Sequence, residues 1–269
     1  MTTYVLGSHE RERERLAHQS SALADVTERF LLAAGLGPGM RVLDLGAGIG
    51  DVAAVAARIV GPGGEVVGVE RDPAMIEAAT GRLAEELPIR LVQGDLTELD
   101  LDEPPFDAAI GRFILMHLTD PAAAVSAAAR HVRAGGIVTF QESTPSEVRV
   151  HPPLPKTEAL IDLLMRVSHR MGPDLRAGDN LRATFLAAGL PDPELRLEAL
   201  IGGRPDAPVY DMLAGITETL LPEIERRGLA RPGEIDPWRL ASELRREVGR
   251  AGGVLVAPPL VAAWARVPD

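Results

Sequence analysis

Short apolar runs alternate with amphipathic stretches across residues 40–142, and each change of period marks the end of one element and the start of the next. The runs VLDLG, EVVGVE and GIVTFQE are almost continuously apolar, as is typical of parallel strands covered on both faces. The pattern predicts strands at 40–45, 65–70, 89–93, 106–111 and 136–142, and helices at 51–60, 73–86 and 121–132. This order of elements predicts a doubly wound α/β core with a mostly parallel sheet.

The segments on either side of this core have a different character. Residues 8–34 form a helical pattern with apolar positions at Leu23, Val26, Phe30 and Leu31. Beyond residue 142 the pattern predicts helices at 154–171, 181–188, 207–228 and 236–250, and strands at 194–201, 253–257 and 260–267. We expect four parts: an N-terminal helical cover over 1–39, the core over 40–142, a lid insertion over 143–178, and a part over 179–269 that completes a seven-stranded sheet and carries inserted helices.

Composition narrows the class of protein and its partners. No apolar run reaches the roughly 18 residues of a membrane helix, and the charged N-terminus lacks the apolar region of a secretory signal, so we expect a cytoplasmic protein without membrane contact. The 39 acidic residues outnumber the 28 basic ones, and the net charge of −11 argues against nucleic acid as a partner. The chain has no cysteine, which excludes disulfides and thiolate chemistry, and we expect no metal site.

The most specific motif is the glycine loop Asp44-Leu45-Gly46-Ala47-Gly48-Ile49-Gly50-Asp51, between the first predicted strand and its helix. Glycine suits a tight turn whose backbone a ligand approaches closely. A dinucleotide fingerprint requires another glycine spacing, and here Asp51 follows Gly50 directly. The loop contains no lysine or arginine, and its two flanking carboxylates would oppose a pyrophosphate. The motif therefore favours a ligand with positive charge and no phosphate.

Two acids at later strand ends extend the same site. Glu70 ends the second predicted strand, where its carboxylate can accept hydrogen bonds from both hydroxyls of a ribose. Asp95 follows the third strand and is placed to accept a hydrogen bond from an adenine amino group. In an open α/β sheet these strand ends meet at one crevice. A ribose, an adenine and a cationic tail together describe S-adenosylmethionine.

With these residues in place, the chain resembles the class I S-adenosylmethionine-dependent methyltransferases that act on small molecules. D-x-G-x-G-x-G, the acid that ends strand two, Gly-Asp after strand three and FDAAIGRFILMHLTDP carry the resemblance over 41–141, and LRATFLAAGL extends it loosely. The resemblance implies a Rossmann-like fold with S-adenosylmethionine as the cofactor. The residues it implies at the cofactor are Asp44, Gly46 and Gly48 under the methionine moiety, Glu70 at the ribose, Asp95 and Leu96 at the adenine, Arg112 and Phe113 after strand four, and Tyr4 and Gln19 folded over it; Ala47 and Arg71 complete the predicted site.

The acceptor is constrained mostly by exclusion. Methyl transfer from a sulfonium chiefly requires the nucleophile to be held in line with the methyl carbon, and a general base helps where the acceptor is a hydroxyl. GRFILMHL follows strand four in place of an N/D-P-P-Y motif, which disfavours amino groups of DNA bases and glutamine amides. The candidate bases are Glu142, at the end of strand five, and His117, with His151 and His169 in the lid insertion. We expect a small, hydrophobic or aromatic methyl acceptor, with O-methylation favoured.

Two alternatives stay open at this point. The chain could bind the cofactor but catalyse a reaction other than methylation, or act as a sensor, since no base is identified with certainty by the sequence. A nicotinamide oxidoreductase is a third reading, which Asp51 and the acidic loop disfavour. The partners expected are the small-molecule acceptor and, as one option, a second copy of the chain in a homodimer.

Overall fold

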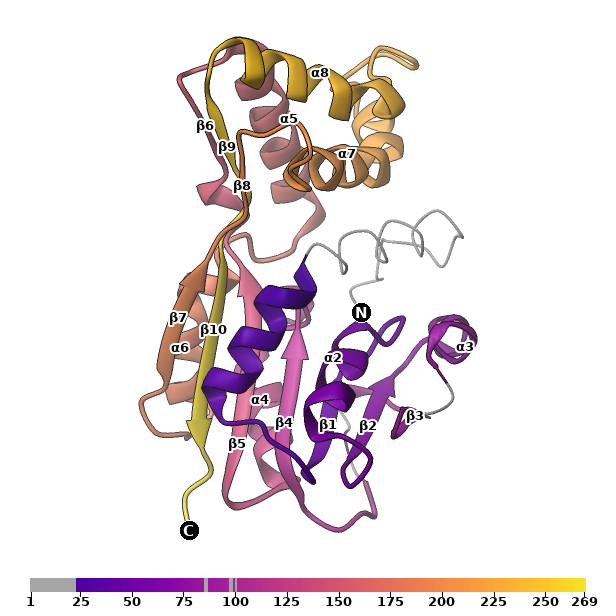
Figure 1. Cartoon of the computed structure of the whole chain (residues 1–269), viewed down its shortest axis with the longest axis vertical. Helices are drawn as coiled ribbons and strands as arrows, with labels where there is room; N and C mark the ends of the chain where they lie inside the picture. Colours follow the sequence, from indigo (N-terminus) through magenta and orange to yellow (C-terminus); the bar gives the residue numbers. More distant parts are fainter. Residues whose placement is uncertain (1–22, 85–86, 97–98, 100) are drawn as a thin grey trace. The chain divides into compact units, whose positions relative to one another are not determined.

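The computed structural model describes residues 23–84, 87–96, 99 and 101–269 (Figure 1). Its contacts divide the chain into two compact units. The larger unit contains Leu23–Glu142, Ala177–Leu197 and Val261–Asp269, and the described part of the smaller unit contains Ser143–Arg176 and Glu198–Leu260. None of the helices within the described ranges is long and apolar enough to cross a membrane.

A seven-stranded sheet forms the centre of the larger unit (Figure 1). Its strand order is β3-β2-β1-β4-β5-β10-β7. The bounds are β1 Arg41–Leu45, β2 Glu65–Glu70, β3 Ile89–Gln93, β4 Phe106–Arg112, β5 Val132–Ser143, β7 Glu194–Glu198 and β10 Leu260–Arg266. The first five strands pair in parallel. Because Gly135 N–H donates to Val267 O and Val267 N–H donates to Gly136 O, both at 2.9 Å, the end of β10 meets the start of β5, and β10 runs antiparallel.

Helices cover both faces of this sheet (Figure 1). The helices are residues 23–34, α2 Asp51–Val60, α3 Pro73–Arg82, the short 3₁₀ helix η2 Leu115–His117, α4 Pro121–Arg130 and α6 Ala177–Ala187. Leu31, Val55 and Ile110 belong to one apolar core, which residues 23–34 and α2 share with the sheet. Phe140 and Phe185 belong to a second core, on the α4 and α6 side, where their rings meet edge to face. The doubly wound, mostly parallel α/β fold predicted from the sequence is therefore confirmed.

The smaller unit has its own sheet and its own apolar core. Its elements are the short 3₁₀ helix η3 Pro145–Glu147, β6 Arg149–His151, α5 Pro155–Met171, β8 Ile201–Gly202, α7 Val209–Arg226, α8 Pro237–Arg250 and β9 Val254–Val256. The strands form a three-stranded antiparallel sheet in the order β6-β9-β8. The core of this unit combines Leu164, Leu213, Leu244 and Leu255 from α5, α7, α8 and β9. Residues 143–176 and residues 198–260 are therefore both needed to build this core.

Most predicted elements have bounds close to those expected. Before residue 142, α3 ends at Arg82 and not at residue 86, and β5 begins at Val132, which the sequence pattern had placed in a helix. Further differences lie after residue 142. The predicted strand at 194–201 is two strands in two sheets, β7 in the large sheet and β8 in the small one. The sequence pattern did not predict β6, which is only three residues long. Residues 198–260 group with 143–176, whereas the sequence placed them in the part that completes the large sheet.

Candidate functional site

The glycine loop after β1 has the backbone that its sequence predicts. Gly46, Gly48 and Gly50 have φ angles of +69°, +54° and +80°, which residues with a side chain rarely adopt. The N–H groups of Gly46 and Ala47 both donate to Val69 O, at 2.9 and 3.0 Å. The loop is therefore fixed to the end of β2, next to Glu70.

Gly46 also lies under a side chain from a distant segment. A Cβ atom at this position would come within 2.8 Å of Ile114 Cδ1. Ile114 belongs to the turn between β4 and η2, and its side chain closes over the loop. The GRFILMHL motif contained Ile114, but nothing in the sequence showed that it would meet the glycine loop.

We expect Gly46→Ala to lower the free energy of unfolding by about 1–3 kcal/mol and to weaken ligand binding at the loop, because the new methyl group combines an unfavourable φ with contact on Ile114. Urea unfolding measures the first effect. Gly63→Ala is the matched control, since a Cβ there meets nothing within 4 Å. Equal losses in the two variants would contradict the argument.

Glu70 is bound by backbone amides on both carboxylate oxygens. Its Oε2 accepts from Gly48 N–H at 2.9 Å, and its Oε1 accepts from the N–H groups of Arg71 and Asp72 at 2.9 and 3.0 Å. A carboxylate offers about four acceptor positions, so these bonds leave room for about one more donor. The sequence predicted that Glu70 accepts from both hydroxyls of a ribose; with the loop in this conformation, one hydroxyl fits better.

Asp44 is the most unusual charged group near the loop. Only 1% of it is exposed, and its Oδ2 accepts no hydrogen bond from any residue that the structure describes. Burial raises the pKa of Asp44 from 3.8 to about 7; Arg112 and a hydrogen bond from the backbone of Ala53 oppose this rise, while Glu70 adds to it. A buried acceptor without a donor is costly, so the site is suited to a ligand that brings a cationic donor.

Arg112 is the last residue of β4 and Phe113 follows it; the helical residues 23–34 hold the first, and β5 holds the second. Arg112 Nη1 donates to Thr27 Oγ1 at 2.8 Å. Burial lowers the pKa of Arg112, although Asp51 and Asp44 act in the opposite direction. Phe113 has a φ of +57°, which is unusual for a bulky residue, and its N–H donates to Gln141 O at 2.9 Å. Thr27 was not among the predicted site residues, although a hydroxyl within the apolar stripe of that helix was a usable signal.

Asp51 has a partner that the sequence did not reveal. Arg82, the last residue of α3, contacts Asp51 Oδ1 through Nη2 at 2.8 Å and donates to Ile49 O through Nη1 at 2.7 Å. The loop is therefore less acidic than its own sequence indicates, because Arg82 and Arg112 both bring positive charge to it. The loop therefore disfavours a phosphate ligand less than its sequence alone indicates.

The remaining predicted residues differ in their surroundings. Asp95 is exposed after β3, and Leu96 packs against the core on the α4 side. Arg71 is exposed, and its carbonyl accepts from Gln93 Nε2 at 3.2 Å. His117 ends η2 and is half-buried, and burial lowers its pKa, with a smaller effect from Arg71. Tyr4 and Gln19 lie outside the described residues.

Glu142, the second candidate base, is fully buried at the end of β5. Its Oε1 accepts from the N–H groups of Ile114 and Leu115 at 2.9 and 2.7 Å. It therefore holds the same turn whose Ile114 covers Gly46. No three histidine, aspartate or glutamate side chains within the described ranges are grouped as a metal site requires.

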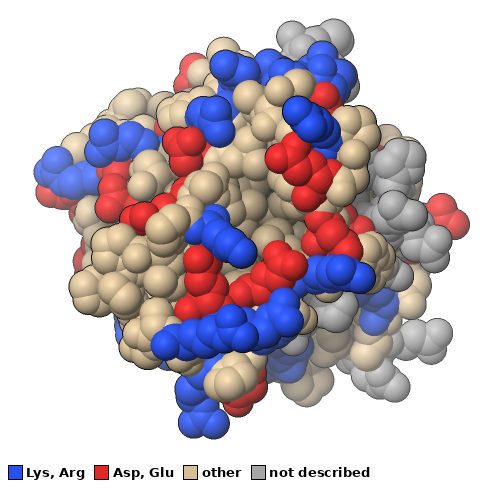
Figure 2. Space-filling view, turned by 90° about the horizontal axis from the view of Figure 1, so that it is seen from above, with Lys and Arg blue, Asp and Glu red and all other residues tan. Residues whose placement is uncertain are grey.

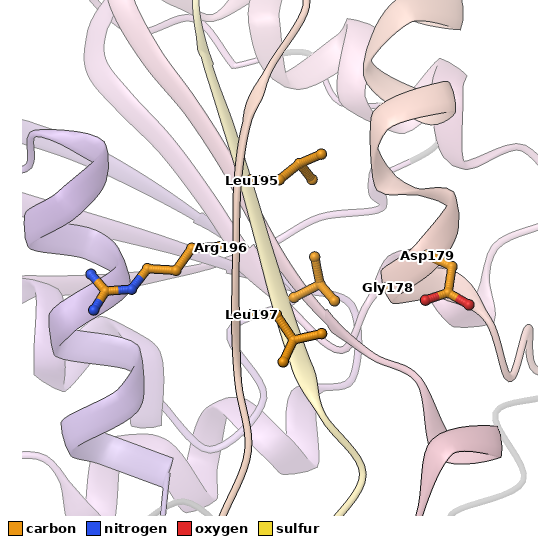
Figure 3. Close-up of a pocket in the computed structure, with 6 residues that line it drawn as sticks. Gly178, Asp179, Leu195, Arg196 and Leu197 are labelled. Carbon is orange, nitrogen blue, oxygen red and sulfur yellow. The ribbon is translucent and has the colours of Figure 1, made fainter.

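A shallow pocket lies elsewhere in the larger unit, at the edge of the sheet opposite β3 (Figure 3). Leu195, Arg196 and Leu197 of β7 line it, together with Asp179 at the start of α6. Figure 3 shows Leu195 and Leu197 on one side of the strand and Arg196 on the other. Since none of the predicted site residues lines this pocket, we place the functional site at the glycine loop.

The residues at the strand ends fit the ligand predicted from the sequence. The loop gives close backbone approach at Gly46 and Gly48, Asp44 offers a buried acceptor for a cationic group, and Glu70 has room for a hydroxyl donor. The structure thus joins the loop to Glu70 through the hydrogen bond from Gly48, and both Arg112 and Glu70 act on Asp44 through their charges. S-adenosylmethionine carries an ammonium group and a ribose, which match these two carboxylates.

Comparison with known proteins agrees with this geometry. Residues 42–136 match the family described as methyltransferase domain. The ubiquinone biosynthesis O-methyltransferase of Alkalilimnicola ehrlichii is 41% identical over 104 residues, which are 38% of this chain and 41% of that protein. The chain spans less than half the length of the curated relatives it matches first.

Two solved structures have a similar fold. Phosphoethanolamine N-methyltransferase 2 of Haemonchus contortus, solved with phosphomonomethylethanolamine and S-adenosylhomocysteine, is 18% identical with a TM-score of 0.55; the match covers 91% of this chain and 53% of that one. The [4+2]-cyclase SpnF is 18% identical with a TM-score of 0.56, and the match covers 91% of this chain and 80% of that one. At these identities the similarity concerns the fold alone.

Proposed function

We propose that this chain, whose residues 42–136 match the methyltransferase domain family, transfers a methyl group from S-adenosylmethionine to a small-molecule acceptor. The observation that carries the proposal is the buried carboxylate of Asp44, whose Oδ2 has no donor among the described residues, next to a glycine loop fixed to Glu70. When bound, the cofactor supplies an electrophilic methyl group on a positively charged sulfur.

The chain's own residues position the reactants. Asp44 and Glu70 bind the ammonium and one ribose hydroxyl, Asp95 and Leu96 meet the adenine, and Gly46 to Gly48 allow close approach. Arg112 balances the charge of Asp44, and Phe113 faces the cofactor from the end of β4. His117 stays a candidate base: a lowered pKa keeps its imidazole neutral near pH 7, as proton acceptance requires.

We propose a small, hydrophobic or aromatic acceptor, and O-methylation ahead of N- or C-methylation. The O-methyltransferase activity in the name of the relative from A. ehrlichii supports this order. Nucleic acid is disfavoured by the net charge of −11 and by the mixture of basic and acidic side chains on the face shown in Figure 2.

The test has two arms. Calorimetry with S-adenosylhomocysteine should show micromolar binding, and NAD should not bind. Transfer of label from methyl-labelled S-adenosylmethionine into small molecules of a cell extract should then be detected. Binding of NAD in place of S-adenosylhomocysteine would refute the proposal.

A second function deserves the same test, because the fold also occurs in the [4+2]-cyclase SpnF. Under this alternative the chain binds the cofactor without transferring its methyl group, as a catalyst of another reaction or as a sensor. Tight binding of S-adenosylhomocysteine with no label transfer into any extract would favour it.

A lid role for residues 143–178 stays a prediction. Exchanging 152–172 for a short linker would remove α5, whose Leu160, Leu163 and Val167 belong to the core of the smaller unit. Loss of activity in that variant would therefore not isolate acceptor binding. The homodimer also stays a prediction, which light scattering would test.

A further inference from the structure

We propose that Glu142 is a positioning residue, which fixes the turn between β4 and η2 against the glycine loop, and that it does not act as the general base. This inference rests on the proposed function for the role of the loop. One of the candidate bases thereby becomes a residue that acts through Ile114 and Gly46.

The contacts of Glu142 are those of an anchor. One carboxylate oxygen, Oε1, accepts two hydrogen bonds, from Ile114 N–H at 2.9 Å and from Leu115 N–H at 2.7 Å. Glu142 is 0% exposed, so water does not compete for these bonds. Hydrogen bonds from neutral donors to an ionised acceptor are among the stronger ones in proteins.

The turn needs such an anchor because its backbone is irregular. Phe113 has a φ of +57°, and the first N–H groups of the short helix that follows have no carbonyl partner within that helix. Gln141 O binds Phe113 N–H, and the side chain of Glu142 binds the next two N–H groups. Consecutive residues at the end of β5 thus hold three consecutive amides of the turn.

The turn between β4 and η2 also limits where the glycine loop can lie. Ile114 Cδ1 is 2.8 Å from the point where a Cβ of Gly46 would be, so the two segments are in direct contact with room for a hydrogen only. Ile114 is also close to the end of β4, since a Cβ on Gly111 would come within 3.3 Å of Ile114 Cγ2 and within 2.7 Å of Phe140 Cε1. Movement of the Ile114 backbone would therefore move the side chain that covers the loop.

The same contacts are unfavourable for a base. A general base must reach the hydroxyl that it deprotonates, whereas Glu142 is 0% exposed and its second oxygen, Oε2, is also buried. An oxygen that already accepts two amide protons has both lone pairs in use. Oε1 is therefore committed to the turn.

The experiment compares Glu142→Ala and Glu142→Gln with wild type. Thr139→Val is the matched control, because Thr139 is a buried polar residue of the same strand that does not bind the turn. The probe is S-adenosylhomocysteine, measured by calorimetry. We expect Kd to rise about 10-fold to 100-fold in Glu142→Ala, to rise less than about 10-fold in Glu142→Gln, whose amide oxygen can still accept, and to change less than about 2-fold in Thr139→Val.

Amide hydrogen exchange gives a readout that does not depend on activity. Exchange at Ile114 and Leu115 should be faster in Glu142→Ala than in wild type, and intermediate in Glu142→Gln. If Glu142→Ala does not fold, the Glu142→Gln variant decides the question through exchange and Kd together.

Two results would overturn the inference: wild-type exchange at Ile114 and Leu115 in both variants, or wild-type affinity in Glu142→Gln together with complete loss of label transfer, which is the behaviour of a base. Failure of the proposed function looks different. Wild-type protein would then not bind S-adenosylhomocysteine, while the exchange measurement would still report on the anchor.

Discussion

At pH 8, and without cofactor, Asp44→Asn should be more stable than wild type by up to about 4 kcal/mol. Burial raises the pKa of Asp44 from 3.8 to about 7, a difference of about 3 pH units, and each unit corresponds to about 1.4 kcal/mol. Above pH 7 the wild-type protein must keep a buried carboxylate ionised, and asparagine removes that charge while nearly preserving the shape of the side chain. This substitution has the largest effect on stability that we expect.

The sign of the pH dependence follows from the direction of the shift. The pKa of Asp44 is higher in the folded state than in the unfolded state, so the folded state holds the proton more tightly between pH 4 and 7. The favourable contribution is complete below pH 4 and is lost as the pH rises through about 7. Urea unfolding at several pH values should therefore show the variant gaining on wild type up to about pH 7 and a constant difference above it.

Asp107→Asn is a control of opposite sign. Although burial acts to raise the pKa of Asp107, hydrogen bonds from the Arg41 backbone and the Arg133 side chain lower it overall. Its replacement should destabilise the protein at neutral pH. Parallel curves of stability against pH for wild type and Asp44→Asn would contradict the prediction.

Asp44→Asn should also bind S-adenosylhomocysteine more weakly than wild type, since the neutral amide cannot form an ion pair with an ammonium group.

The largest expected effect on binding is that of Glu70→Ala, which should raise the Kd for S-adenosylhomocysteine about 100-fold or more. Alanine removes the acceptor for a ribose hydroxyl and also leaves the amides of Gly48, Arg71 and Asp72 without their partner. Losing hydrogen bonds to a charged group costs about 1.5–3 kcal/mol each, so the loss of one ligand bond and the loosening of the loop suffice for this factor.

Glu65→Ala is the matched control for Glu70→Ala. Glu65 lies at the other end of β2 and pairs with Arg41 and Arg90 at a partly exposed position. Its removal should change stability by less than about 1 kcal/mol and leave Kd unaltered. Equal affinities of wild type and Glu70→Ala would refute the assignment of Glu70 to the site.

The sequence predicted the core of the fold closely because local signals agreed there with the tertiary structure. The glycine loop and the apolar strand patterns gave β2, β3 and α2 their expected bounds. The pattern was less informative after residue 142, where strands of two or three residues leave too few positions for a period to appear. The split of 194–201 between two sheets depends on pairing with β10 and β9, which are distant in sequence.

For the candidate site too, features set by local sequence could be predicted, and contacts between residues distant in sequence could not. The positions of Asp44 and Glu70 at adjacent strand ends could be predicted, because topology alone places them there. The partners of these residues could not: Arg82 reaches Asp51 from the end of α3, and Thr27 reaches Arg112 from residues 23–34. Such contacts depend on side-chain directions that one sequence does not encode in any local pattern.

The composition of the smaller unit has a consequence for recombination among related enzymes. β6, in residues 143–176, pairs with β9, in residues 198–260. Thr157 Oγ1 donates to Glu247 Oε2 at 2.6 Å between the same two segments. A chimera that exchanges only 143–176, or only 198–260, would join strands and cores that were not selected together. Both segments must be inherited as a pair, so crossovers at their four ends are the ones that should yield folded hybrids.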